Sequence, residues 1–92
     1  MGKPVDTRVV EYAYVITYEV MKNVLSGNKN SVRISITYEL KDSNKEYIGS
    51  THKEHYIEAQ GQLNDTQTAE LVNANLGTLV LADKAELSGY QP

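Results

Sequence analysis

Val32-Arg33-Ile34-Ser35-Ile36-Thr37-Tyr38-Glu39-Leu40 alternates apolar and polar residues over nine positions without an interruption. This two-residue period is typical of a β-strand that buries one face and leaves the other in water. Similar residues occur earlier in the chain, where Ile16-Thr17-Tyr18-Glu19-Val20 resembles Ile36-Thr37-Tyr38-Glu39-Leu40. Two such strands joined by a turn predict a β-hairpin.

The first strand of this hairpin is predicted over residues 8–24, the second over 31–41, and Gly27 and Asn28 supply the turn. A two-residue loop would set the apolar face of one strand against the polar face of the other. A three-residue loop over 27–29 instead pairs Tyr18 with Tyr38 and Ile16 with Leu40. Because a slip of one residue turns every side chain to the other face, the sequence favours the three-residue loop.

A third strand is predicted over residues 46–59, after a turn at 42–45. The pair Tyr47-Ile48 recurs as Tyr56-Ile57 at an odd spacing, which cannot place both copies on one face of a regular strand. We therefore expect a β-bulge within residues 49–54, with Gly49 as its natural position. The polar run over 50–55 is typical of an edge strand.

The C-terminal third predicts one α-helix over residues 65–76, with Asn64 or Asp65 as its N-cap and Gly77 directly after its end. Residues 78–81 fit either a short fourth strand or more helix, and 82–87 favour helix. The predicted fold is α+β: an antiparallel three-stranded β-meander packed on one C-terminal helix. We expect a single domain over 1–92, with a flexible arm at 1–7 and a flexible tail at 88–92.

The composition narrows the class of partner. The chain has 92 residues, a net charge of −3, no cysteine, and seven tyrosines as its only aromatic residues. An acidic chain without a basic run favours neither nucleic acid nor an anionic membrane as partner. Without an apolar run long enough to span a bilayer, and without a signal-like start, we expect a soluble cytoplasmic protein.

Two groups of residues could carry chemistry. His52, His55 and Glu58 could bind a metal or act in acid–base catalysis at a subunit interface, but in a strand the two histidines point to opposite faces, so we favour a solvated edge strand. The tyrosines at 12, 14, 18 and 38 could form a stacking platform for a small ligand or for nucleic-acid bases, but glutamates flank them, so we favour core packing under the helix. We predict no enzyme activity, metal or cofactor.

The remaining signal is the first half of the first strand. In the chosen register, Val10, Tyr12 and Tyr14 extend past the second strand and need another partner for their backbone groups. We expect them to pair either with residues 79–81 or with a second copy of the chain, and we favour the second copy. The predicted function is therefore a non-enzymatic structural or protein-interaction module that forms a homo-oligomer through an exposed strand or docks on a larger assembly.

Overall fold

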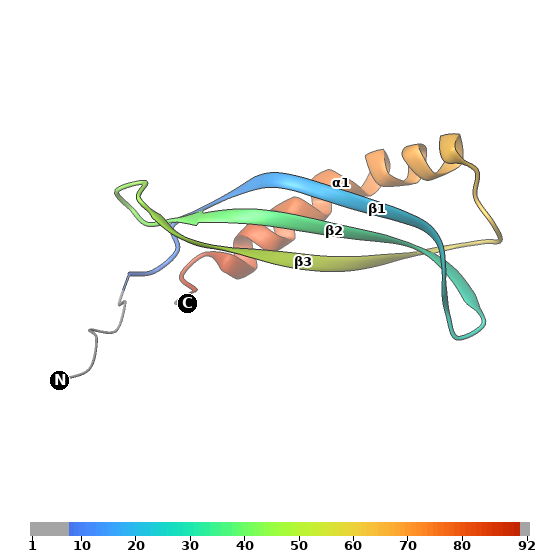
Figure 1. The fold of residues 1–92 in the computed structure, drawn as a ribbon, viewed down its shortest axis with the longest axis horizontal. Helices are drawn as coiled ribbons and strands as arrows, with labels where there is room; N and C mark the ends of the chain where they lie inside the picture. The colour runs from blue at the N-terminus through green and yellow to red at the C-terminus, as the bar shows by residue number, and fades with distance from the viewer. Residues whose placement is uncertain (1–7, 91–92) are drawn as a thin grey trace.

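A computed structural model describes residues 8–90, which form three β-strands followed by one α-helix (Figure 1). The elements are β1 (Tyr12–Ser26), β2 (Lys29–Lys41), β3 (Tyr47–Ala59) and α1 (Asp65–Leu87). Strand β2 lies in the centre and pairs antiparallel with both neighbours. The predicted α+β meander is therefore confirmed. The predicted arm at 1–7 lies outside the described residues, as do residues 91 and 92.

The core lies between α1 and one face of the sheet, which we call the helix face. The alternating residues of β2 form its centre and are at most 1% exposed: Val32, Ile34, Ile36, Tyr38 and Leu40. Val72 and Leu87 contribute from α1, and Val10 and Ala13 from the start of the chain. The opposite face of the sheet, here the open face, has no second layer within residues 8–90 (Figure 1).

The predicted register between β1 and β2 is wrong. Ser26 pairs with Lys29, so the turn has two residues, and Gly27 takes a φ of 64° that favours glycine. A bulge between Met21 and Val24 adds one residue to β1, with Asn23 at a φ of 57°. The extra residue restores the phase that the short turn alone would lose. As a result Tyr18 lies opposite Ile36, and apolar side chains still face apolar side chains.

A second bulge in β1, between Val15 and Thr17, shifts the first part of the strand again. Tyr12 lies opposite Lys41 and Tyr14 opposite Glu39, so the predicted overhang does not exist. The overhang was expected because the predicted register contained neither of the two bulges in β1.

Val10 finds its partner within the chain, although not at residues 79–81. Its backbone N–H donates to the carbonyl of Tyr90 at 2.9 Å, and the N–H of Gly89 donates to the carbonyl of Val10 at 2.8 Å. The described part of the predicted flexible tail is therefore hydrogen-bonded beside the start of β1.

Strand β3 is an edge strand, as predicted, and it contains one bulge. Leu40 pairs with Gly49 and Lys41 with Tyr47, so Ile48 is the extra residue. The bulge therefore lies one residue before the predicted range. It has the predicted effect, because Tyr47 and Tyr56 oppose Lys41 and Arg33, two residues of the open face.

Helix α1 begins where the sequence predicts and ends eleven residues later than predicted, at Leu87. Asn64 is the N-cap: its side chain accepts from the N–H of Gln67 at 2.8 Å, and the Gln67 side chain accepts from the N–H of Asn64 at 3.0 Å. Gly77 lies inside the helix, and residues 78–81 are helical. The burial of Asp83 and Leu87 against the sheet explains why the helix continues through a glycine that costs only about 1 kcal/mol.

We expect Gly77→Ala to raise the free energy of unfolding by about 0.5–1 kcal/mol, because alanine restricts the unfolded chain more than glycine does. Gly77 has no positive φ, and a Cβ built there meets nothing within 4 Å. Urea unfolding of both proteins measures the difference. Gly27→Ala is the control, since the left-handed backbone of Gly27 should make that substitution destabilising. Changes of the same sign in the free energy of unfolding of both variants would contradict a helical Gly77 and a left-handed Gly27.

Candidate functional site

Exposed apolar side chains concentrate on β1. Of thirteen exposed large apolar side chains within residues 8–90, eight belong to β1 and a ninth, Val9, precedes it. The eight are Tyr12, Tyr14, Val15, Ile16, Tyr18, Val20, Met21 and Leu25. Ile16 is 56% exposed and Leu25 is 75% exposed. Single exposed apolar residues are ordinary, but a concentration of them is unusual, and here it follows one strand along both of its faces.

The backbone of β1 is also accessible, because β1 forms one edge of the sheet. Gly89 and Tyr90 cover this edge only at Val10. From Tyr12 to Ser26, no strand within residues 8–90 lies on the outer side of β1. A long edge strand with apolar side chains is a template for another strand. Both properties of the surface, its side chains and its backbone, therefore favour strand pairing.

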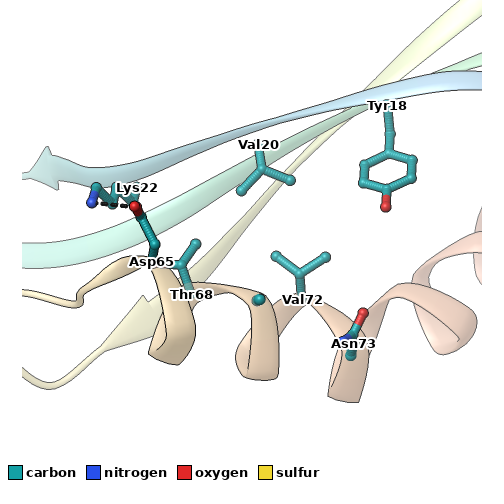
Figure 2. Close-up of a pocket in the computed structure, with 8 residues that line it drawn as sticks. Tyr18, Val20, Lys22, Asp65, Thr68, Val72 and Asn73 are labelled. Carbon is teal, nitrogen blue, oxygen red and sulfur yellow. Dashed lines mark hydrogen bonds and ion pairs between the residues drawn. The ribbon is translucent and has the colours of Figure 1, made fainter.

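A groove runs between β1 and the first turns of α1, with a volume of about 390 Å³ (Figure 2). Tyr18 and Val20 point from β1 toward the helix, where Thr68 and Val72 line the other wall. Both β1 side chains are half-exposed although they lie on the helix face. The helix therefore leaves the outer edge of its own sheet face incompletely covered.

One end of this groove carries an ion pair between Lys22 and Asp65, with Nζ 2.6 Å from Oδ1 (Figure 2). The hydrogen bond from Lys22, together with its positive charge, lowers the pKa of Asp65. Asp65 is fully exposed, so we assign the pair little weight in folding. It does establish that the Lys22 side chain lies on the helix side of β1.

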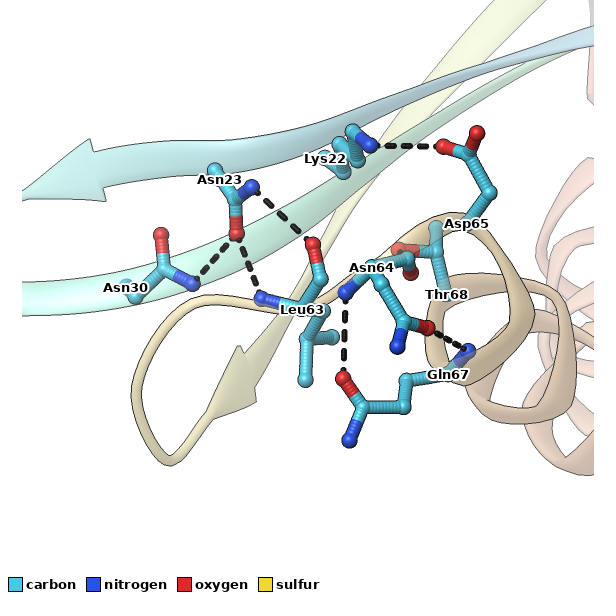
Figure 3. Close-up of polar contacts among 8 residues, drawn as sticks. All are labelled: Lys22, Asn23, Asn30, Leu63, Asn64, Asp65, Gln67 and Thr68. Carbon is cyan, nitrogen blue, oxygen red and sulfur yellow. Dashed lines mark hydrogen bonds and ion pairs between the residues drawn. The ribbon is translucent and has the colours of Figure 1, made fainter.

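Asn23 holds the bulge between Met21 and Val24 to the loop before α1 (Figure 3). Its side chain donates to the carbonyl of Leu63 at 3.2 Å and accepts from the N–H of Leu63 at 2.9 Å. Asn30 donates to the Asn23 side chain at 2.9 Å and to the carbonyl of Gly61 at 2.7 Å. These contacts position the N-terminal end of α1 beside β1 and so define the groove.

The predicted tyrosine stripe is divided between the two faces of the sheet. Tyr18 and Tyr38 lie on the helix face, whereas Tyr12 and Tyr14 oppose residues of the open face. The bulge at Ile16 causes this division.

On the open face, the rings of Tyr12 and Tyr14 stack with centroids 6.2 Å apart. The ammonium groups of Lys45 and Lys41 lie over these two rings, at 5.8 Å and 5.5 Å from the respective centroids. The positive charges therefore already contact the aromatic faces that a stacked ligand would use.

A buried polar cluster joins α1 to the sheet. Asp83 is 2% exposed, and its Oδ2 accepts from the hydroxyl of Tyr38 at 2.6 Å and lies 2.8 Å from Nε2 of His55. Sequence reasoning missed Asp83 because a charged residue is usually assigned to the solvent side of a helix. A signal was present, since the buried ring of Tyr38 needs a hydrogen-bond partner and Asp83 lies midway between Leu79 and Leu87 along the helix.

We expect the Tyr38 hydroxyl to make stability fall at alkaline pH. Burial, together with the hydrogen bond to Asp83 and its charge, raises the pKa of Tyr38. Above about pH 10 the unfolded chain releases this proton and the folded chain retains it, so stability present below that pH is lost as pH rises, by at most about 1.4 kcal/mol per pH unit.

Urea unfolding near pH 9 and near pH 11, on either side of the ordinary tyrosine pKa of about 10, measures this loss. The slope of the free energy of unfolding against pH measures how many protons the chain releases on unfolding. Tyr38→Phe should reduce that number by about one, whereas Tyr56→Phe, at an exposed ring, should leave it unchanged. Equal slopes in all three proteins would contradict the assignment.

The residues singled out for metal or acid–base chemistry are not brought together. His52 opposes Thr37 on the open face, His55 contacts Asp83 on the helix face, and Glu58 lies 3.5 Å from Lys29. Within the described part of the chain, no group of three or more histidine or acidic side chains is arranged to hold a metal ion. No helix in residues 8–90 has the length and apolar character needed to cross a membrane.

Comparison of the chain with protein-family models, with curated proteins and with solved structures gave no match. The candidate site therefore stands on the geometry of β1 alone.

Proposed function

We propose that this protein is a non-enzymatic interaction module that binds polypeptide by adding a strand to the free edge of β1. The observation that carries the proposal is the coincidence on β1 of a free backbone edge and the largest group of exposed apolar side chains. In strand addition, main-chain hydrogen bonds supply affinity and side chains on alternate positions supply specificity.

The interacting residues of the proposal differ in part from those of the sequence prediction. Tyr12 and Tyr14 are 36% and 40% exposed and remain members of the surface. Val10 is 1% exposed and its backbone groups are hydrogen-bonded to Gly89 and Tyr90. It therefore belongs to the core and not to the proposed binding edge. The proposed binding edge of β1 is therefore centred near Ile16 and Val20, and not near Val10.

A labelled strand peptide tests the proposal. Peptides with the sequences of residues 12–26 and 47–59 are titrated with the full chain, and binding is followed by fluorescence anisotropy. We expect at least one peptide to bind. Ile16→Lys combined with Val20→Lys should weaken that binding about 10-fold or more, because charge on an edge strand opposes pairing.

The matched control places the same two charges on the other edge strand, as Tyr47→Lys with Tyr56→Lys, and circular dichroism verifies that both variants fold. Binding that survives the β1 variant, or is lost equally in both variants, would contradict the proposal.

A further inference from the structure

Resting on the proposed function, we infer that the strand added to β1 is β1 of a second copy, paired antiparallel about a two-fold axis at Val20. The result is one continuous six-stranded sheet with both helices on the same side. Such an interface is isologous, because each copy contributes the same surface. The inference follows from the residues that two-fold axes at positions 18 to 22 would bring together.

The two-fold axis must be normal to the sheet for identical antiparallel strands to be neighbours in it, so every residue must oppose one on the same face. The pairing within the chain assigns these faces. Residues opposite the buried side of β2 lie on the helix face, namely Ala13, Val15, Tyr18, Val20 and Leu25. Lys22 reaches Asp65 on the same side. Glu19, Met21 and Val24 oppose Ser35, Arg33 and Ser31, so they lie on the open face.

An axis at Val20 satisfies these assignments. It sets Val20 against Val20, Val15 against Leu25 and Tyr18 against Lys22, all on the helix face. On the open face it sets Glu19 against Met21. Leu25, the most exposed of the apolar side chains, thereby gains an apolar neighbour.

Axes at the neighbouring residues either set like charges against each other or set a residue of one face against a residue of the other. An axis at Glu19 places two carboxylates directly opposite each other, and an axis at Lys22 places two ammonium groups opposite each other, both of which are destabilising. An axis at Tyr18 sets Val15 of the helix face against Met21 of the open face. An axis at Met21 sets Tyr18 against Val24 with the same mismatch.

The irregular parts of β1 also match in the chosen register. Ile16, the extra residue of the bulge between Val15 and Thr17, comes opposite Val24, and Thr17 comes opposite Asn23 in the bulge between Met21 and Val24. The bulges of the two copies therefore lie beside each other. Tyr14 comes opposite Ser26, so the pairing ends before Val10, where Gly89 and Tyr90 cover the edge.

The same pairing explains the groove between β1 and α1. Two Val20 side chains meet at the axis, so the two grooves join into one apolar space between the helices. The Tyr18 ring of each copy lies beside Lys22 of the other, an arrangement that favours a cation–π contact. The half-exposed side chains of the groove thus become covered.

Single cysteines test the register, because the natural chain has none. Facing residues of an antiparallel pair have Cα atoms about 4.5–5.5 Å apart, within the range that a disulfide spans. Val20→Cys should therefore form a covalent dimer under mild oxidation. Tyr18→Cys and Lys22→Cys should each stay monomeric on a non-reducing gel, whereas their equimolar mixture should cross-link. More efficient cross-linking of Tyr18→Cys or Glu19→Cys than of Val20→Cys would overturn the inference.

Charge at Met21 supplies a second, non-covalent test. Because Glu19 faces Met21 twice in the dimer, Met21→Lys should lower the dimer Kd by roughly 2- to 30-fold and Met21→Glu should raise it by a similar factor. Sedimentation equilibrium measures both, with Leu81→Lys and Leu81→Glu on the exposed side of α1 as controls. Equal shifts at Met21 and Leu81 would overturn the register.

The mass of the wild-type chain separates this inference from the proposed function. A monomeric mass by light scattering at every concentration overturns self-pairing. Strand-peptide binding that the Ile16→Lys, Val20→Lys variant weakens would then leave the proposed function in place. A dimer whose Kd the β1 variant does not change also overturns the inference.

Discussion

Ile36→Ala should lower the free energy of unfolding by about 3–5 kcal/mol, the upper part of the range for a large aliphatic side chain removed from a core. Ile36 is 0% exposed and lies at the middle of the central strand, opposite Tyr18 on β1 and Lys53 on β3. The loss combines the transfer of the removed methyl groups with the cavity that remains. A paired strand on each side limits how far the backbone can move into that cavity.

Urea unfolding followed by circular dichroism measures this loss. Thr37→Ala is the matched control, because it is the next residue of the same strand and points to the open face. It should cost less than about 1 kcal/mol, the span of β-propensity in a host protein. A smaller loss of unfolding free energy at Ile36 than at Thr37 would show that the core does not lie on the helix face of the sheet.

Asp83→Ala should lower the free energy of unfolding by about 3 kcal/mol, because it leaves the buried hydroxyl of Tyr38 without its acceptor. The substitution also removes the partner of the His55 ring, whose side chain is 21% exposed. Water can reach part of that ring, so most of the expected loss belongs to Tyr38.

A double-mutant cycle with Tyr38→Phe separates this contact from general packing. The double variant should be more stable than the two single losses predict, by about 1–3 kcal/mol, because both polar partners are then absent. Glu86→Ala is the comparison on the same helix: its bond to Lys53 is exposed and should be worth less than about 1 kcal/mol. Additive losses at Asp83 and Tyr38 would contradict a direct contact.

The proposed dimer changes what these measurements report. Stability of an associating protein depends on its concentration, since any species that binds only the folded chain raises apparent stability. The Ile36 and Asp83 variants alter the interior of one copy, whereas the Met21 variants alter only the contact between copies. The first two should therefore lower stability at every concentration, and Met21→Glu should do so only where the wild type is dimeric.

The local elements follow from the sequence by itself. The alternation over Val32–Leu40 places β2 and its buried face, and Asn64 with Gln67 marks the start of α1. The spacing of Tyr47 and Tyr56 requires a bulge in β3, and the structure has one within two residues of Gly49. These features depend on side-chain period and on capping, which act between residues close together in the chain.

Only the tertiary structure determined the rest, because the deciding contacts join distant residues. The bulge at Asn23 depends on hydrogen bonds to Leu63, and it sets the register that sequence reasoning missed. The helix passes Gly77 because Asp83 meets Tyr38 and His55 on two strands. The start of β1 is closed by Gly89 and Tyr90, which leaves Tyr12–Ser26 as the free edge. A local pattern fixes which face of a strand is apolar; which edge stays free depends on where the chain returns.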